Sequence, residues 1–165
     1  MSPGDPSVEA EIAIYENTPC EGTRTFCSIG LYSADLILGD KVVKQELVMA
    51  AGDDFDRKEV AAFLSTVTDD IRSSGEALAG SDIVEMEFAV TPGTQMRFVF
   101  ACSDAVMPDD IPRFPLSRPG VSFVRVVPIH DDEADLAVTD DWQKLEDAFR
   151  KEKADLSDLH RESIF

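Results

Sequence analysis

The run His130-Asp131-Asp132-Glu133 is the densest group of side chains that could bind a metal ion. If this run begins a helix, His130 and Glu133 are three positions apart and share one face of it. One histidine with carboxylates binds divalent ions weakly. A simpler interpretation is favoured, because the run follows Pro128 and carboxylates at the start of a helix are stabilised by its dipole. We therefore expect an acidic helix start and no metal site.

A second acidic group, Asp53, Asp54 and Asp56, resembles a calcium loop in composition only. The calcium loop needs a twelve-residue pattern with a glycine in its middle and a glutamate at its end, and that pattern is missing. These residues are better explained by the entry into a helix, which acidic side chains cap.

Nucleophilic catalysis needs a base oriented beside the nucleophile, and the chain has two histidines, His130 and His160, to supply one. Neither histidine lies in a known nucleophile motif. Ser28 lacks the G-x-S-x-G turn of the hydrolases, and no glycine-rich loop is present to bind phosphate. Acidic pairs carry little weight, because 33 acidic residues make chance pairs common. We expect neither a catalytic residue nor a cofactor.

Cysteine usage and the apolar runs indicate the compartment. Cys20, Cys27 and Cys102 are odd in number and form no C-x-x-C pair, which argues against a disulfide framework or a zinc site. Reduced thiols in a cytoplasmic protein are the default, with Cys27 and Cys102 buried on strands. The N-terminal residues have neither the basic nor the apolar region of a signal peptide. No apolar run approaches the roughly 20 residues that span a bilayer.

The hydrophobic pattern predicts the elements that position these groups. Alternating apolar residues predict strands over 11–15, 24–31, 45–50, 83–90, 95–101 and 121–127. The segment 91–94 is a predicted hairpin turn, Pro128 is expected to end the last strand, and 107–120 reads as a proline-rich loop. Regular strand–helix alternation is absent. We therefore predict an α+β fold: a flexible arm over 1–10, then a single domain over 11–165 with a mixed, largely antiparallel sheet and helices packed on it.

Two helices are expected. The first begins at Asp56, a plausible N-cap with Glu59 three residues later, and ends at the Ser-Ser-Gly cluster of 73–75. Its apolar face consists of Val60, Phe63, Leu64, Val67 and Ile71. The second helix is marked by Trp142, Leu145 and Phe149, with Asp140 and Asp141 at its positive N-terminal end.

The net charge of −18 restricts the class of partner. Such a surface repels nucleic acid phosphates and anionic lipids, so binding to nucleic acid or to a membrane is disfavoured. It attracts basic proteins instead. An alternative that is equally open is that proteins of this organism are acidic in general, which keeps them soluble, and that the acidity of this chain has no specific role.

Several segments together resemble the bacterial branch of the suppressor-of-fused domain family. The segment 25–33 is similar to an early strand of the family that ends in a G-[ML]-S-like turn, although Tyr32 is inserted before Ser33. Residues 46–49 are similar to its E-L-[VM]-[LM] strand, and 123–129 followed by Glu133 to its V-P-I-x-x-x-E segment. The tail resembles its closing D-x-x-R-x-S segment through Asp158, Arg161 and Ser163. The proline-rich loop over 108–119 departs from the family.

The resemblance implies a compact domain without enzymatic activity. Animal members of the family bind and restrain a transcription factor, and bacterial members are often proposed as immunity proteins that neutralise a toxin. This agrees with the absence of a recognisable catalytic motif. The leading hypothesis is thus a non-catalytic protein-binding domain, an immunity protein for a basic toxin. The alternatives are an enzyme with a carboxylate- or metal-based site and a self-associating structural domain. The oligomeric state is left open.

The expected partner surface is the stretch of highest acid density, with a second acidic turn and an apolar loop beside it. One or two carboxylates cap a helix, and the excess before Trp142 has no evident structural purpose. The main candidates are Asp131, Asp132, Glu133, Asp135, Asp140 and Asp141, with Glu146 and Asp147 close behind. The second candidates are Asp53 and Asp54, and the apolar anchors are Ile111 and Phe114, with Leu116.

Overall fold

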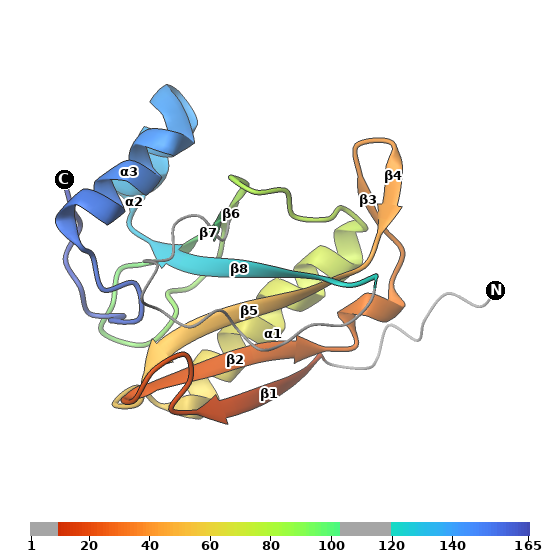
Figure 1. Ribbon diagram of the computed structural model, residues 1–165, viewed down its shortest axis with the longest axis horizontal. Helices are drawn as coiled ribbons and strands as arrows, with labels where there is room; N and C mark the ends of the chain where they lie inside the picture. Colours follow the sequence, from red (N-terminus) through yellow and green to blue (C-terminus); the bar gives the residue numbers. More distant parts are fainter. Residues whose placement is uncertain (1–9, 103–119) are drawn as a thin grey trace.

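The computed structural model describes residues 10–102 and 120–165, except for the side chain of Asp140. A six-stranded sheet has the strand order β1-β2-β5-β8-β7-β6 (Figure 1). The strands are β1 (Glu11–Glu16), β2 (Thr23–Ile29), β5 (Gln45–Gly52), β6 (Ile83–Glu85), β7 (Phe98–Cys102) and β8 (Ser122–Ile129). Every neighbouring pair is antiparallel except β5 and β8, which are parallel. The predicted α+β class, with a mixed and largely antiparallel sheet, is confirmed.

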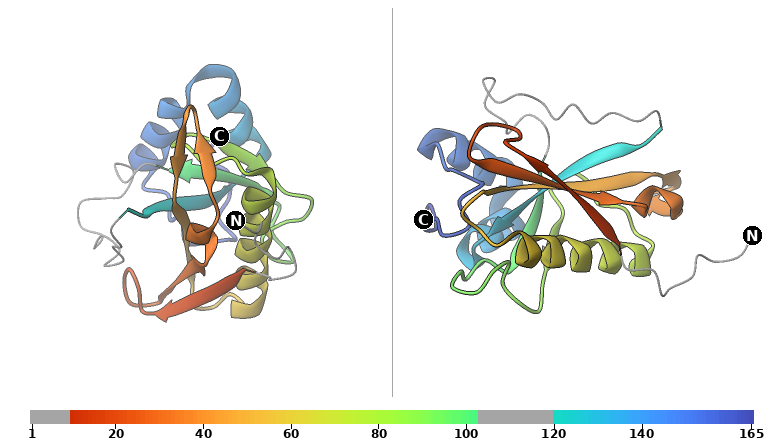
Figure 2. Two further views of the ribbon diagram at one scale, coloured as in Figure 1. Left: turned by 90° about the vertical axis from the view of Figure 1, so that its right-hand side faces the viewer. Right: turned by 90° about the horizontal axis from the view of Figure 1, so that it is seen from below.

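The helix α1 (Arg57–Ser74) lies along one face of this sheet (Figure 2). Its N-cap is Asp56, whose carboxylate accepts hydrogen bonds from the backbone N–H groups of Lys58 and Glu59 at 2.8 and 3.1 Å. Gly75 caps the other end with a φ of 71°, a conformation that glycine adopts without strain. The five predicted apolar residues are all buried. The start, the end and the buried face of this helix are therefore as predicted.

Side-chain alternation along the strands divides the interior into two clusters. Leu47, Met49 and Ala51 of β5 belong to the larger cluster with α1. Val127 and Ile129 of β8 belong to the second, where α3 (Trp142–Glu152) contributes the apolar positions Leu145 and Phe149. Between β8 and α3 lie the short helix α2 (Asp131–Leu136) and a π-helical turn over Ala137–Asp141. The predicted second helix is thus α3.

The strand predicted over 24–31 ends earlier than its hydrophobic pattern indicated. β2 stops at Ile29, and the buried Leu31 begins a 3-10 turn over Leu31–Ser33. The reason is a buried carboxylate: Glu46 accepts hydrogen bonds from the N–H groups of Gly30 and Tyr32 at 2.9 and 3.1 Å, and Gly30 has a φ of 100°. The carboxylate draws the chain out of the sheet at this point.

The strands predicted over 83–90 and 95–101 are shortened to β6 and β7, although the turn between them is where it was expected. Residues 86–97 leave the sheet because Met86, Val90 and Met96 are buried in the cluster under α1. A tertiary contact therefore overrides the alternating pattern.

Pro128 does not end the last strand, because β8 continues through it to Ile129. Its carbonyl accepts a hydrogen bond from the Arg161 guanidinium at 3.3 Å. In a strand the nitrogen of a residue points to the same side as its carbonyl, so the missing N–H faces the tail and not β7. The proline costs no ladder bond on the β7 side.

A small hairpin that the sequence prediction missed stands beside the main sheet. It is formed by β3 (Leu36–Leu38) and β4 (Lys41–Val43), neither of which the hydrophobic pattern predicted. The hairpin projects from the body of the molecule in Figure 1. Its cross-strand pair Ile37 and Val42 is 46% and 60% exposed.

The packing of α1 makes the first prediction. Replacing the buried Phe63 by alanine should lower the free energy of unfolding by about 3–5 kcal/mol, because it leaves a cavity between the helix and the sheet. Urea denaturation followed by circular dichroism measures this. The matched control is Val138→Ala, at a side chain that is 73% exposed, which should change stability by less than about 0.5 kcal/mol. Equal effects of the two substitutions would show that this helix face is not a core.

Candidate functional site

The acidic run that follows β8 begins α2, as the helix-start interpretation predicted. His130 is the N-cap residue, and its backbone N–H donates to the Glu133 carboxylate at 2.9 Å. Asp131, Asp132 and Glu133 all lie in the first turn, where the helix dipole stabilises negative charge. Glu133 differs from its two neighbours, because it points inward.

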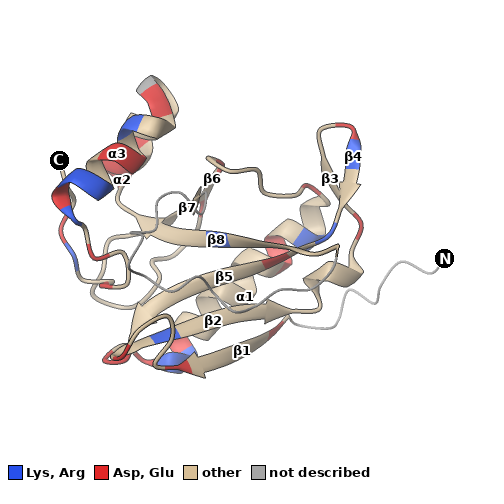
Figure 3. Cartoon of the chain, in the orientation of Figure 1, with Lys and Arg blue, Asp and Glu red and all other residues tan. Residues whose placement is uncertain are grey.

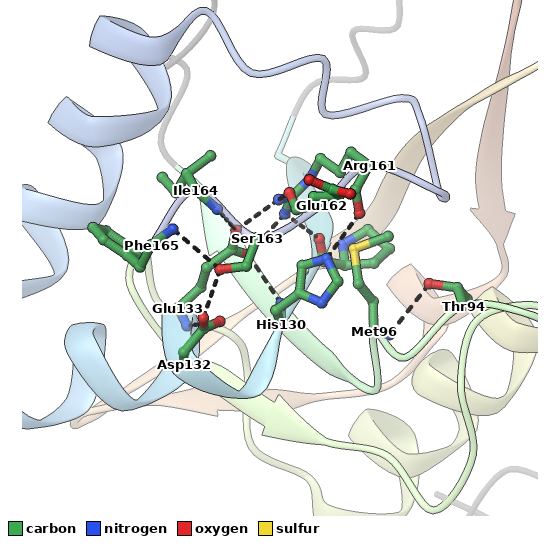
Figure 4. Close-up of polar contacts among 11 residues, drawn as sticks. Thr94, Met96, His130, Asp132, Glu133, Arg161, Glu162, Ser163, Ile164 and Phe165 are labelled. Atoms are coloured by element: carbon green, nitrogen blue, oxygen red, sulfur yellow. Dashed lines mark hydrogen bonds and ion pairs between the residues drawn. The ribbon is translucent and has the colours of Figure 1, made fainter.

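Glu133 forms a buried, two-pronged ion pair with Arg161 of the C-terminal tail (Figure 4). The two guanidinium nitrogens donate to its two oxygens at 2.6 and 2.8 Å, and the backbone N–H of Ile164 adds a third bond at 3.3 Å. Glu133 is fully buried and the Arg161 side chain is 7% exposed. The inclusion of Glu133 in a partner-facing surface was therefore wrong, because a partner cannot reach this carboxylate.

Further contacts fix the tail against α2 and α3. The Arg161 guanidinium lies over the Phe149 ring, 5.2 Å from its centre. The His130 Nε2 atom is 2.9 Å from the carbonyl oxygen of Arg161, and the Ser163 hydroxyl donates to Asp132 at 2.7 Å. Asp132 is thus exposed, but its carboxylate is already hydrogen-bonded to the tail. The residues around this tail serve to anchor it.

A second buried carboxylate, Glu46, holds the opposite end of the sheet. Besides the two N–H groups described above, it accepts a hydrogen bond from the Ser28 hydroxyl. The same Ser28 oxygen accepts from the N–H of Leu47 at 2.8 Å. Ser28 is 1% exposed, so its hydroxyl, which links Glu46 to the backbone of Leu47, serves the fold and is out of reach of a substrate.

The thiols have the expected positions. Cys27 on β2 and Cys102 on β7 are buried, and Cys20 is exposed. Burial, with a smaller effect of the Glu46 charge, raises the pKa of Cys27 to about 12. Burial likewise raises the pKa of Cys102 to about 12, partly offset by Arg125. Both buried thiols are therefore protonated at neutral pH and poor nucleophiles.

The other acidic residues of the α2–α3 region differ in whether a partner could reach their side chains. Asp131 is exposed and lies 3.6 Å from Arg97, and Asp135 is exposed. Asp141 caps α3 through a 2.9 Å bond from the N–H of Gln143, and Glu146 is buried. The side chain of Asp140 lies outside the described residues. Figure 3 shows that acidic residues also occur on several other elements.

The structure does not bring the two predicted acidic groups into one site. Asp131 and Asp132 border a hollow of about 840 Å³ beside the end of the tail, together with both histidines. Asp54 borders a different hollow, of about 870 Å³, between the turn before β2, the end of β5 and residues 155–158. Asp53 and Asp54 are both exposed. The predicted anchors Ile111 and Phe114, with Leu116, lie outside the described residues.

Within residues 10–102 and 120–165, no three His, Cys, Asp or Glu side chains converge as metal ligands would. In the same part of the chain, no helix is long and apolar enough to cross a membrane.

The buried ion pair makes the second prediction. Arg161→Met keeps most of the side-chain volume but leaves the Glu133 carboxylate buried without its partner, so it should cost about 3–5 kcal/mol of stability. Chemical denaturation measures the loss. Glu162→Gln, at the exposed neighbouring position, is the control and should be nearly neutral. If Arg161→Met is neutral too, the ion pair does not hold the tail.

Thiol exposure makes the third prediction. In the native protein an aromatic disulfide reagent should modify Cys20 at the rate of an ordinary exposed thiol. Cys27 and Cys102 should react only after unfolding, because both are buried and protonated. Counting the released chromophore before and after adding guanidinium measures this. Fast reaction of the Cys20→Ser variant under native conditions would contradict the prediction.

Comparison with known proteins identifies the family. The sequence profile of the family "Suppressor of fused protein (SUFU)" matches residues 7–162. No curated protein matches the sequence. Several solved structures share the fold at low sequence identity, and three of them are described here. A chain of "the Sufu-Fu complex crystal structure" has a TM-score of 0.70 at 13% identity, over 98% of this chain and 80% of that one.

The other two structures come from a bacterium and an insect. A putative suppressor-of-fused homologue from Neisseria gonorrhoeae has a TM-score of 0.72 at 17% identity, over 98% of this chain and 83% of that one. Drosophila Suppressor of Fused has a TM-score of 0.66 at 14% identity, over 94% of this chain and 42% of that one. The profile match over nearly the whole chain and the shared fold lead to one conclusion: this chain belongs to the suppressor-of-fused family.

Proposed function

We propose that this chain is a non-catalytic domain that binds another protein. The observation that carries the proposal is its membership in a family that works through protein–protein interaction, with a solved Sufu–Fu complex among the structures of the same fold. Fold by itself does not determine function, so the chain's own residues must also fit.

The groups that could perform catalysis fit a structural role. The Ser28 hydroxyl is bonded to Glu46, the Cys27 thiol is protonated, and Glu133 is neutralised by Arg161. A general base or nucleophile needs a reachable reacting atom, and these groups lie in the interior. This supports a binding role over an enzymatic one.

We further propose that the partner is basic and that the domain acts as a cytoplasmic immunity protein against a toxin. The net charge of −18 supports this, because a strongly acidic surface attracts a basic protein over a distance and speeds association. Toxin domains that act on nucleic acid are commonly basic, and an acidic inhibitor presents a similar field to that of the phosphates. Among the predicted acidic residues, Asp53, Asp54, Asp131 and Asp135 are exposed and take no part in the capping of α3 or in the contacts of the tail, although Asp131 lies 3.6 Å from Arg97.

Charge alone does not supply a high affinity, because exposed ion pairs contribute about 0–1 kcal/mol each. Apolar anchors are also needed. Ile111 and Phe114 remain proposed anchors, and the β3–β4 hairpin adds the exposed Ile37 and Val42.

The test compares two variants of equal net charge, with the partner recovered from the native organism. In the first, Asp53, Asp54, Asp131 and Asp135 are changed to Asn. In the control, four other exposed acids are neutralised: Asp40, Asp70, Glu76 and Glu87. The first variant should slow association about five- to tenfold at low salt and flatten its salt dependence, with little change in dissociation. Surface plasmon resonance at several salt concentrations measures both rates.

Two outcomes would contradict the proposal at different levels. Equal slowing in both variants would mean that only the overall charge matters and that these four residues are not the contact surface. Failure of the chain to protect cells from a co-expressed basic partner would exclude the immunity role, while leaving protein binding intact.

A further inference from the structure

A hollow of about 870 Å³, the β5 hollow, lies at the end of the sheet where the chain turns from β1 into β2. Its walls are that turn, the end of β5 with the turn after it, the middle of β8, and the stretch from the end of α3 to residue 158. The N–H of Gly52 donates to the carbonyl of Ser157 at 2.9 Å. The N–H of Asp53 donates to the carbonyl of Gly22, also at 2.9 Å. The walls are therefore fixed to one another, which limits the ordering cost of binding.

The cations that border the β5 hollow are mostly compensated by nearby acids. Arg150 forms an ion pair with Asp147 at 2.9 Å. Arg125 is 9% exposed, and its charge acts on the same buried thiol of β7 as the charge of the buried Glu146, in the opposite direction. These two charges therefore lie near one another and offset each other. Among the described residues that border the hollow, Lys153 is the one cation left.

The carboxylates that border the β5 hollow outnumber this cation. Four of them come from three segments, and none forms an ion pair in the described part of the chain: Glu21, Asp54, Asp155 and Asp158. Glu21 and Asp54 are exposed, at the mouth of the hollow. The hollow thus carries a net negative charge, which a cationic group would compensate.

Asp155 and Asp158 are fixed at the two ends of one turn. The N–H of Asp158 donates to the carbonyl of Asp155 at 3.1 Å, which places their Cα atoms within about 7 Å of each other. The Oδ1 atom of Asp155 accepts from the N–H and the hydroxyl of Ser157 at 3.0 and 2.6 Å. The Oδ1 atom of Asp158 accepts from the N–H of His160 at 2.9 Å. Each carboxylate is thus held in place, and its Oδ2 atom has no hydrogen-bond partner among the described residues.

The arrangement of these carboxylates suits an organic cation better than a metal ion. Among the residues that the structure describes, no three His, Cys, Asp or Glu side chains converge as metal ligands do. A guanidinium spreads five N–H donors over a plane, so it can bond to two carboxylates that lie several Å apart. The half-buried Ala154 and Leu156 of the same wall offer apolar surface to the aliphatic stem of such a side chain. An arginine therefore fits the hollow.

We propose that the β5 hollow binds an arginine side chain of the basic protein partner, through Asp155 and Asp158. This deepens the proposed function and rests on it, since it names where the charge of the partner is held. A charge pair shielded from water acts mainly on dissociation, whereas dispersed surface carboxylates act on association. The hollow thus supplies affinity that exposed ion pairs lack.

The thiol of Cys20 reports the potential of the hollow without any partner. It borders the β5 hollow and is exposed, while the other two thiols are buried. The full-length chain is treated with a trimethylammonium-ethyl and a sulfonato-ethyl methanethiosulfonate at about 0.1 M salt, where charges farther away than about 10 Å are largely screened. Relative to mercaptoethanol, the ratio of the two rates should favour the cationic reagent about fivefold. A ratio at or below that of mercaptoethanol would mean that the basic residues dominate, and would overturn the proposal.

Two double variants of equal net charge separate the hollow from the overall charge. Asp155→Asn with Asp158→Asn keeps the oxygens that accept from the backbone, and should lower the rate ratio about threefold. The control is Asp40→Asn with Glu76→Gln, two exposed acids beside the β3–β4 hairpin. β2 is seven residues long and separates that hairpin from the β5 hollow by roughly 20 Å (Figure 1). The control should therefore change the ratio less than about 1.5-fold. Equal effects of the two double variants would overturn the proposal.

Protection of Cys20 by a peptide tests whether an arginine occupies the hollow. The peptide acetyl-Gly-Arg-Gly-amide at about 10 mM should slow the reaction of Cys20 with the uncharged methyl methanethiosulfonate at least about twofold. The same peptide with citrulline has nearly the same shape but no charge, and should give no protection. Equal protection by the two peptides, or protection by neither, would overturn the proposal.

Kinetics with the native protein partner distinguish this proposal from the wider one. The partner should dissociate at least about fivefold faster from the Asp155→Asn, Asp158→Asn variant than from the control variant. Equal dissociation rates would mean that the β5 hollow does not hold the partner, while protein binding stands. If the arginine peptide protects Cys20 but the chain binds no protein of its organism, the proposed function is wrong and the hollow is a site for a free basic ligand.

Discussion

The buried ion pair between Glu133 and Arg161 is the constraint on which the C-terminal half of the molecule depends. A carboxylate that is fully removed from water is stable as an ion only when it is paired and hydrogen-bonded, and the guanidinium with two backbone N–H groups meets that need. The pair joins the first turn of α2 to the tail. Because the same guanidinium also bonds the Pro128 carbonyl, it sets the position of the tail against the end of β8.

Glu46 performs the corresponding task at the other end of the sheet, where it turns the chain after β2. The segments that carry the family resemblance contain these same groups: Glu46 in one, Glu133 in another, Arg161 and Ser163 in the last. The recognisable residues of this chain are therefore those that build the framework. This explains why family membership indicates a fold and a mode of action, while the partner must be identified by surface residues outside these motifs.

Two properties of the surface would act on recognition in different ways. The dispersed carboxylates act over a distance and would influence how fast a basic protein arrives. Exposed apolar side chains such as Ile37 and Val42 act only on contact. The two are complementary, since long-range attraction does not select the geometry of the partner and apolar contact does not select its charge.

The sequence by itself determined the elements whose signals are local. The apolar face of α1, its Asp56 and Gly75 caps, the acidic start of α2 and the fold class all follow from periodicity and capping, which depend on neighbours a few residues apart. Tertiary structure decided the rest. Glu133 reads like the other acids of its run, and only a guanidinium 28 residues away makes it a buried residue. The early ends of β2 and β6 and the passage of β8 through Pro128 likewise depend on distant side chains. A local pattern cannot reveal such partners, because the energy of a buried charge or an unpaired backbone group depends on what the folded chain brings beside it.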